Sequence, residues 1–232
     1  MSKNKKLLLI LVFFTSLLIL LLFLDYFGII WHNSLFASKY SVKGIDVSHH
    51  QGEIDWQKVA ATNKYSFVFI KATEGHDFTD DKFEKNWQEA KINGLRVGAY
   101  HFFSMRSSGN TQAEHFISVV PNEDTFLAPV LDIEISLNHD PESVRKEISD
   151  MSTSLENYYH KKPILYVTYS TYNQYVKNYF SDHKIWIRDV IKFPNLNNRD
   201  WVLWQYNNRG RVSGINAYVD INVLNGELND LE

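Results

Sequence analysis

The chain has 232 residues, and its 44% hydrophobic and 22% charged content is ordinary for a globular protein. The formal net charge is −3, and it falls to −6 without the three lysines among the first six residues. This acidic balance excludes the basic surface that a nucleic-acid binder needs, so nucleic acid is not expected as a partner. Cysteine is absent, which excludes a catalytic thiol, a cysteine-ligated zinc site and a disulfide framework.

The N-terminal region is typical of a membrane anchor. Residues 7–24 form an apolar run interrupted only by Thr15 and Ser16, and the residues before it carry lysines. About 20 apolar residues cross a bilayer as a helix, whereas the apolar part of a signal peptide is roughly 7–15 residues long. We therefore predict a cytoplasmic segment at 1–6, a transmembrane anchor at 7–31 and an extracytoplasmic domain at 43–232.

A short linker, residues 32–42, joins the predicted anchor to the domain. Fully extended, these residues reach ~35 Å, which keeps the domain close to the membrane face. A cleaved signal peptide with a secreted product remains the alternative. Its best cleavage position follows Ala37, but Leu35 occupies the −3 position, where a small residue is preferred.

Short β-rich runs alternate with helical patterns along the domain, which predicts parallel βα units. The predicted strands are Gly44–Ser48, Ser66–Lys71, Arg96–His101, Ala128–Glu134, Pro163–Thr168, Lys184–Arg188, Trp201–Tyr206 and Tyr218–Ile221. The predicted helices are Asp55–Thr62, Asp80–Ile92, Asn110–Val119, Pro141–His160 and Ser170–Tyr179, with Asp80 and Ser170 as N-caps. The last two connections carry no helical pattern. We therefore predict an α/β fold, a trimmed TIM-like (β/α)5(β)3 barrel preceded by one N-terminal transmembrane helix.

Four acidic side chains fall at predicted strand ends, where β/α barrels build their active sites. Asp46 lies near the end of the first strand, Asp132 and Glu134 end the fourth, and Asp220 ends the eighth. In a closed barrel the eighth strand adjoins the first, so we expect Asp46 and Asp220 to be neighbours. Asp132 and Glu134 share one face of their strand, and crowding of carboxylates keeps one of them protonated at neutral pH. Glycosidic cleavage needs such an acid beside a charge.

Two other interpretations stay open from the residues. The acids could instead pair with Lys71, Arg96 or Arg188 in structural ion networks. The adjacent histidines His49 and His50 have no zinc-binding spacing, although a His–Asp–Asp site assembled by the fold remains an alternative. A serine triad is disfavoured because there is no Gly-x-Ser-x-Gly elbow. We expect neither a metal nor a cofactor.

Aromatic residues make up 15% of the chain, and most are expected in the core. Three of them, Tyr100, Tyr166 and Trp204, lie near the predicted carboxyl rim of the barrel. An aromatic ring at such a rim gives a flat platform for a sugar ring. We therefore predict that these three residues bind substrate.

Six stretches of the chain form a recognisable set: 44–52 (GIDVSHHQG) with 54–56 (IDW), 69–75 (FIKATEG), 98–103 (GAYHFF), 129–134 (PVLDIE), 204–206 (WQY) and 219–222 (VDIN). In this order they resemble glycoside hydrolase family 25, the Chalaropsis-type lysozymes. Each stretch is weak by itself, but six at compatible spacing are specific, and they cover roughly residues 42–225. The resemblance implies the trimmed barrel and hydrolysis of the β-1,4 bond between N-acetylmuramic acid and N-acetylglucosamine in peptidoglycan.

The resemblance also implies roles for individual residues. Glu134 resembles the family's general acid, and Asp132 looks like the partner that stabilises the transition state or orients the substrate's acetamido group. Asp46 and Asp220 match supporting acidic positions. The matching stretches further place Gln205 and Glu74, with the three aromatic residues above, among the expected substrate-binding residues.

One position departs from the family pattern. Arg188 follows Trp186-Ile187 where the family usually has a small residue, which puts the sugar contacts at this point in doubt. We predict a monomeric, membrane-anchored muramidase whose partner is the peptidoglycan glycan strand. A catalytically silent glycan-binding barrel and a chitinase-like hydrolase are the alternatives.

Overall fold

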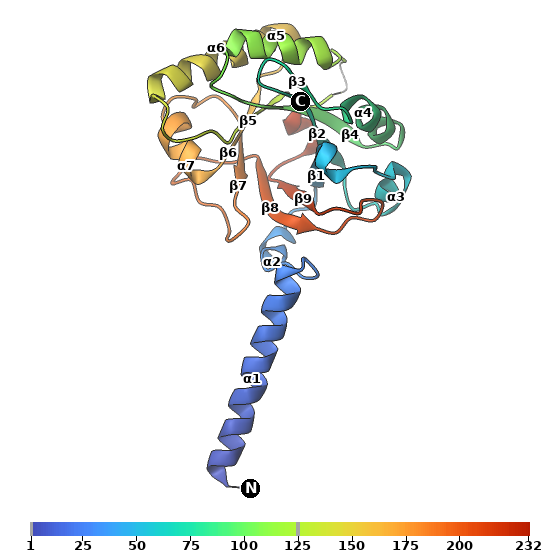
Figure 1. Cartoon of the computed structure of the whole chain (residues 1–232), viewed down its shortest axis with the longest axis vertical. Coiled ribbons are helices and arrows are strands. Elements are labelled where there is room, and N and C mark those ends of the chain that lie inside the picture. Colours follow the sequence, from blue (N-terminus) through green and yellow to red (C-terminus); the bar gives the residue numbers. More distant parts are fainter. Residues whose placement is uncertain (1, 124–125) are drawn as a thin grey trace.

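The computed structural model describes residues 2–123 and 126–232. Strands form a closed ring with helices packed around its outside, and one long helix, α1 (Lys3–Tyr26), projects away from the ring (Figure 1). Helices α5 and α6 cover the side of the ring opposite to α1. The closed α/β barrel with a preceding apolar helix confirms the predicted fold class.

Eight strands make up the barrel wall in the described residues. In ring order they are β1 (Lys43–Val47), β2 (Phe67–Glu74), β4 (Arg96–Phe102), β5 (Val130–Ile133), β6 (Ile164–Val167), β7 (Ile185–Arg188), β8 (Leu203–Gly210) and β9 (Val219–Leu224). Neighbours from β1 to β8 are parallel, and β9 closes the ring by pairing with both β8 and β1. Each barrel strand overlaps a predicted one. β3 (Phe78–Thr79) was not predicted, and it folds back as a hairpin on β2.

The direction of the last strand differs from the regular βα pattern. β9 runs antiparallel to both of its neighbours, because β8 and β9 are joined as a hairpin without a crossover helix. Asp220 therefore stands near the start of an antiparallel strand and not at the end of a parallel one. Although β9 runs in the opposite direction, Asp220 still lies at the same rim, where it is paired with Asp46 in the register of β1 and β9. The predicted proximity of Asp46 and Asp220 is confirmed.

The helices outside the barrel follow the predicted pattern with shifted ends. They are α3 (Trp56–Ala61), α4 (Phe83–Ile92), α5 (Gly109–Val119), α6 (Pro141–Tyr159) and α7 (Tyr169–Thr171), which continues as a π-helical turn (Tyr172–Val176). Asp140 caps α6, with its Oδ2 atom accepting a hydrogen bond from the Ser143 amide at 2.9 Å. The predicted caps Asp80 and Ser170 are wrong: α4 begins three residues after Asp80, and Thr168 caps α7.

Apolar side chains fill both faces of the barrel wall. One cluster lies between strands and helices, and a smaller one fills the barrel interior with Phe67, Phe69 and Trp186. Gly44 and Gly98 leave room for the interior rings, since a Cβ atom at either position would lie within 2.5 Å of Phe67 or Phe69. Leu231, in the C-terminal turn, is fully buried at the other end of this interior cluster. The interior is therefore packed, and open space is left near the carboxyl ends of the strands.

α1 stands apart from the barrel. Its 24 residues have a mean hydropathy of 3.2 in the most apolar window, and none of them is buried. Among the described residues it is the helix long and apolar enough to cross a membrane. After α1 the chain does not extend freely, because a short helix, α2 (Ser34–Ala37), packs on β8.

Candidate active site

The four predicted acids line one pocket at the carboxyl rim of the barrel. The pocket has a volume of about 180 Å³ and is lined by Asp46, Ser48, His50, Lys71, Tyr100, Phe102, Val130, Asp132, Glu134, Tyr166, Trp186, Gln205 and Asp220. β1, β5 and β9 supply the acids, so residues up to 174 positions apart meet in one place. None of the four is bound to Arg96, which pairs with Glu232.

Asp46 is held by hydrogen bonds from neighbouring strands. Its Oδ2 atom accepts hydrogen bonds from the Asn222 side-chain amide at 2.7 Å and from the Gln205 amide at 3.3 Å. Burial raises the pKa of Asp46 to about 6, although these two hydrogen bonds oppose the rise. Burial, followed by the charge of Asp46, raises the pKa of Asp220 to about 8. Both pKa values are thus raised toward neutral pH, because the two carboxyl groups are buried beside each other.

Asp132 is the most enclosed of the four acids. It is only 9% exposed, and its Oδ1 atom is buried without a hydrogen-bond partner among the described residues. Burial and then the charges of Glu134 and Asp46 raise the pKa of Asp132 well above its usual value. Asp132 lines the pocket, so its carboxyl group is placed to meet a polar group of a bound molecule.

Glu134 follows the last residue of β5 and is the most accessible of the four acids, with its side chain 33% exposed. Burial raises the pKa of Glu134, and the positive charge of Arg188 opposes the rise. The Nε atom of Arg188 lies 4.0 Å from the Glu134 Oε1 atom. A carboxyl group with a raised pKa that reaches the open side of a pocket is placed to donate a proton to a substrate.

Tyr100, Tyr166 and Gln205 line the pocket as predicted, which makes them candidate substrate-binding residues. The Tyr166 hydroxyl donates a hydrogen bond to the Gln205 Oε1 atom at 3.0 Å. Burial raises the pKa values of both tyrosines well above the usual range, so both hydroxyls stay neutral donors. The two tyrosines therefore offer polar groups beside the acids without adding charge.

Two predicted substrate-binding residues lie outside this pocket. Trp204 has no exposed surface: its ring packs against Trp201 and Phe193, and its Nε1 atom donates to the Asp189 carbonyl oxygen at 2.8 Å. Side chains alternate along β8, so Gln205 faces the pocket and Trp204 faces outward. The prediction that Trp204 binds sugar is therefore corrected.

Glu74 lines a second cavity of about 220 Å³ that shares Phe102 and Glu134 with the first. Its Oε2 atom accepts a hydrogen bond from the Lys71 Nζ atom at 2.8 Å. The two cavities meet at Glu134, so Glu134 lies at the middle of a longer groove. Glu74 lines the second cavity and Asp46 the first, so the predicted substrate contact of Glu74 belongs to the second cavity.

Two further residues line the pocket that the sequence analysis did not predict to bind substrate, Trp186 and Lys71. Trp186 lines the pocket and donates from its Nε1 atom to the Asn222 Oδ1 atom at 2.9 Å. Lys71 lines it too and supplies the positive charge that opposes the pKa rise of Asp132. The available signal was the alternation along each strand: Trp186 and Arg188 share a face of β7, and Asp220 and Asn222 share a face of β9.

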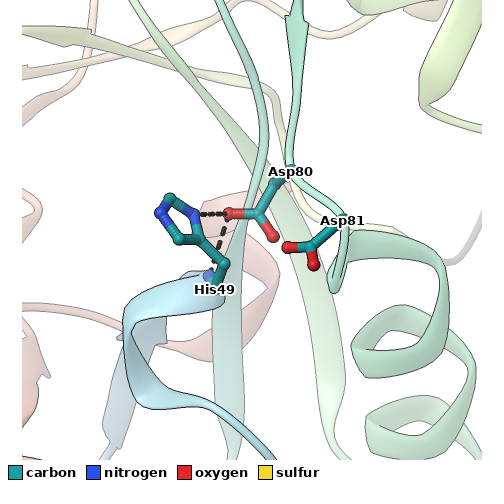
Figure 2. Close-up of side chains that lie close together, drawn as sticks. All are labelled: His49, Asp80 and Asp81. Atoms are coloured by element: carbon teal, nitrogen blue, oxygen red, sulfur yellow. Dashed lines mark hydrogen bonds and ion pairs between the residues drawn. The ribbon is translucent and has the colours of Figure 1, made fainter.

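A histidine and two aspartates do come together beside the barrel, as the open alternative allowed. Figure 2 shows the His49 ring facing Asp80, with the Asp81 carboxylate next to it. The Asp80 Oδ2 atom accepts from the His49 amide at 2.9 Å and from its Nδ1 atom at 2.7 Å, while Oδ1 accepts from the Lys82 amide. These donors already occupy both oxygens of the buried carboxylate. These hydrogen bonds join the turn after β1 to the start of α4.

The sequence model of Glycosyl hydrolases family 25 matches residues 45–215, well over half of the chain. The chain belongs to glycosyl hydrolase family 25. The family match includes Asp46, Asp132 and Glu134 and ends before Asp220, whose place in the site comes from the β1–β9 pairing.

Family 25 proteins of known name and structure resemble most of the chain. Lysozyme M1 of Streptomyces globisporus is 33% identical over 210 residues, which are 82% of this chain and 70% of that protein. A family 25 glycosyl hydrolase from Bacillus anthracis matches with a TM-score of 0.78 at 44% identity, covering 83% of this chain and 92% of that one. A bacterial lysozyme from Streptomyces coelicolor matches with a TM-score of 0.75 at 32% identity, covering 82% and 95%.

Proposed function

We propose that this family 25 hydrolase is a muramidase that cleaves the β-1,4 bond between N-acetylmuramic acid and N-acetylglucosamine in peptidoglycan. The observation that carries the proposal is the convergence of Asp46, Asp132, Glu134 and Asp220 in one pocket. The relatives named lysozyme support the substrate. Retention of at least one proton among these crowded acids supplies the acid that glycosidic cleavage requires.

In this proposal Glu134 protonates the leaving oxygen. It is the most accessible of the four acids and stands where two cavities join, so a glycosidic oxygen bound across the groove would lie beside it. Asp132, which lines the same pocket, stabilises positive charge on the sugar or orients the acetamido group. The raised pKa values of Asp46 and Asp220 limit the negative charge of the pocket.

The decisive experiment follows the ends of the cut glycan. Full-length protein in detergent is incubated with purified peptidoglycan, and the new reducing ends are identified after reduction. We expect muramic acid at the new ends. Glu134→Gln should lower the rate about 100- to 10,000-fold without altering the melting temperature, the range attributed to a general acid. Glu114→Gln, an exposed glutamate on α5, is the matched control and should keep full activity.

The same products discriminate the alternatives. A silent glycan-binding barrel would sediment with peptidoglycan and release no ends. A chitinase-like hydrolase would cut N-acetylglucosamine polymers faster than peptidoglycan and leave N-acetylglucosamine at the new ends. Either result would refute the muramidase proposal.

We further propose that α1 is an uncleaved anchor, with residues 1–6 in the cytoplasm, the anchor within 7–31, and the barrel of residues 43–232 outside as a monomer. The length and hydropathy of α1 and the three lysines in its first turn support this topology. A short connection to the bilayer would confine the enzyme to the wall of the producing cell. Abundant active protein lacking residues 1–37 in the culture supernatant would refute retention of the anchor.

A further inference from the structure

The chain between α1 and β1 is bound to the barrel and is not a free tether. Asn33 and Ala37 have no exposed surface. The Trp31 Nε1 atom donates to the Tyr206 carbonyl oxygen at 2.6 Å, and the His32 Nε2 atom lies 2.9 Å from the Ile191 carbonyl oxygen. We call residues 27–40 the juxtamembrane segment. These contacts fix it to β8 and to the loop between β7 and β8.

A second set of contacts reaches the end of α1 itself. Arg209 donates a hydrogen bond to the Tyr26 carbonyl oxygen, and its guanidinium lies 4.4 Å from the centre of the Tyr26 ring. The Arg211 Nε atom donates to the Phe27 carbonyl oxygen at 3.1 Å. The β8–β9 hairpin therefore holds the helix end directly.

These contacts set the height of the barrel above a bilayer. At ~1.5 Å per residue the 24 residues of α1 are about 36 Å long, slightly more than the ~30 Å hydrocarbon core. If α1 crosses the membrane, Tyr26 and Phe27 lie at the outer interface. The barrel groups that bind their carbonyl oxygens must then lie at the same depth.

The barrel surface around the helix end has the composition of a membrane-contacting surface. Its exposed apolar side chains include Ile29, Ile30, Leu35, Phe36, Ile191 and Phe193. Four cations stand among them: Lys39, Lys192, Arg209 and Arg211. We call these residues the juxtamembrane patch. In Figure 1 the loop after β7 and the β8–β9 hairpin lie on either side of the upper end of α1.

We propose that the juxtamembrane patch rests on the outer leaflet of the bilayer that α1 crosses, with its apolar side chains among the headgroups and its cations against anionic phospholipid. The inference rests on the membrane span proposed above and not on the hydrolase activity. Apolar and aromatic groups favour this interface, and cations near it are attracted by anionic headgroups. The barrel would then sit on the membrane in one orientation.

This contact has a consequence for the substrate groove. Tyr206, which binds Trp31, is the residue after Gln205, and Asp189, whose carbonyl oxygen accepts from the Asn33 amide at 3.3 Å, follows Arg188. The rim of the active site thus adjoins the patch along the chain. The groove is held at one height, where it meets the glycan layer nearest to the membrane.

Site-specific labels test the proposal, because the chain has no cysteine of its own. Ile191→Cys and Ile92→Cys introduce single labelling sites at positions 77% and 81% exposed, the first in the patch and the second at the end of α4. Each full-length variant is spin-labelled in nanodiscs containing phosphatidylglycerol. We expect the label at 191 to be relaxed by oxygen, which enters lipid, and the label at 92 by a water-soluble nickel chelate.

A third label separates the proposal from the span on which it rests. Leu17→Cys, in the middle of α1, should report lipid if α1 crosses the bilayer. Lipid contact at 17 with water contact at 191 equal to that at 92 overturns the proposal and leaves the span standing. Water contact at 17 overturns both. The label at 191 is also measured in discs of neutral phosphatidylcholine. If it lies as deep there as in discs with phosphatidylglycerol, the claim that the cations bind anionic phospholipid is refuted.

Discussion

Arg188 is the residue at which this site departs from the pattern expected of its family. It stands near three of the four acids, and its positive charge opposes the pKa rise of Asp46, Glu134 and Asp220. No carboxylate lies closer to it than the 4.0 Å that separates it from Glu134 in the described part of the chain. Arg188 thus forms only a long ion pair with Glu134, and its charge lowers the pH at which the site loses its proton.

Removal of this charge should move the pH profile of the enzyme. In Arg188→Gln the pKa values of Glu134 and Asp46 rise further, so Glu134 stays protonated to higher pH and Asp46 ionises later. We expect both limbs of the kcat/KM profile to move upward by roughly half to one pH unit, as expected for the loss of a nearby opposite charge. The measurement is the initial rate of glycan cleavage between pH 4 and 9.

The conservative variant is the control for that prediction. Arg188→Lys keeps the positive charge and should leave both limbs within about 0.3 pH units of the original. A profile that falls in height without moving along the pH axis in Arg188→Gln would show that Arg188 binds substrate and does not adjust the acids.

Among the elements, β9 determines whether the site exists. It carries Asp220 and Asn222, and its pairing with β1 brings these residues to Asp46. The carboxyl group of Asp220 is therefore enclosed by the same pairing that closes the barrel. Since burial is the main cause of its raised pKa, barrel closure and ionisation of Asp220 oppose each other.

This opposition predicts a pH-dependent gain in stability from Asp220→Asn. A carboxyl group whose pKa is raised from 3.8 to about 8 on folding contributes its full stability below the unfolded pKa, and that contribution is lost as the pH rises through about 8. We expect Asp220→Asn to melt roughly 2–8 °C above the original at pH 8.5 and at nearly the same temperature at pH 4. Calorimetry at both values checks this.

The control for the β9 prediction is Asp77→Asn, at a side chain 74% exposed, which should change neither melting temperature by more than about 1 °C. Equal melting temperatures of Asp220→Asn and the original at pH 8.5 would contradict the prediction. Glycan cleavage by Asp220→Asn should fall, because the residue lines the pocket.

Most elements could be predicted from local patterns, and the differences have tertiary causes. The β-rich runs marked every barrel strand, because a strand buried on both sides must be apolar along its length. The direction of β9 could not be read from residues 218–221, since a hairpin with β8 and a parallel strand have the same local pattern. The outward face of Trp204 was missed because the phase of alternation on β8 depends on the register with β7 and β9. Asp80 does not cap α4, because its side chain is hydrogen-bonded to His49, which lies in a turn distant along the chain.

At the scale of the whole molecule, the chain that follows α1 is bound to the barrel and does not hang free between them. The sequence analysis predicted a linker of about ten residues and could state only its length, not its contacts. The contacts of Trp31, Asn33 and Arg211 depend on surfaces that exist only after the barrel has closed. This explains why the apolar and aromatic residues of the segment could be noticed in the sequence while their partners could not.

A single glycine tests this rigid connection. Gly28 has a φ of +63°, and a Cβ atom there would lie 2.1 Å from the Arg209 carbonyl oxygen, so a larger side chain must separate the juxtamembrane segment from the β8–β9 hairpin. Gly28→Val should increase the rate of chymotryptic cleavage within residues 27–36 about 10-fold or more in micelles, because cleavage requires local release of the segment. Gly94→Val is the matched control: it has a φ of +86° with no atom within 4 Å of the added Cβ, so it carries the backbone strain without the clash. Equal cleavage of the two variants would mean that the segment is already free.

Cleavage of short soluble glycan fragments should persist in Gly28→Val, since Gly28 lies outside the active-site pocket. A selective loss of activity on intact wall would then show that the fixed orientation of the barrel serves the enzyme at the membrane face.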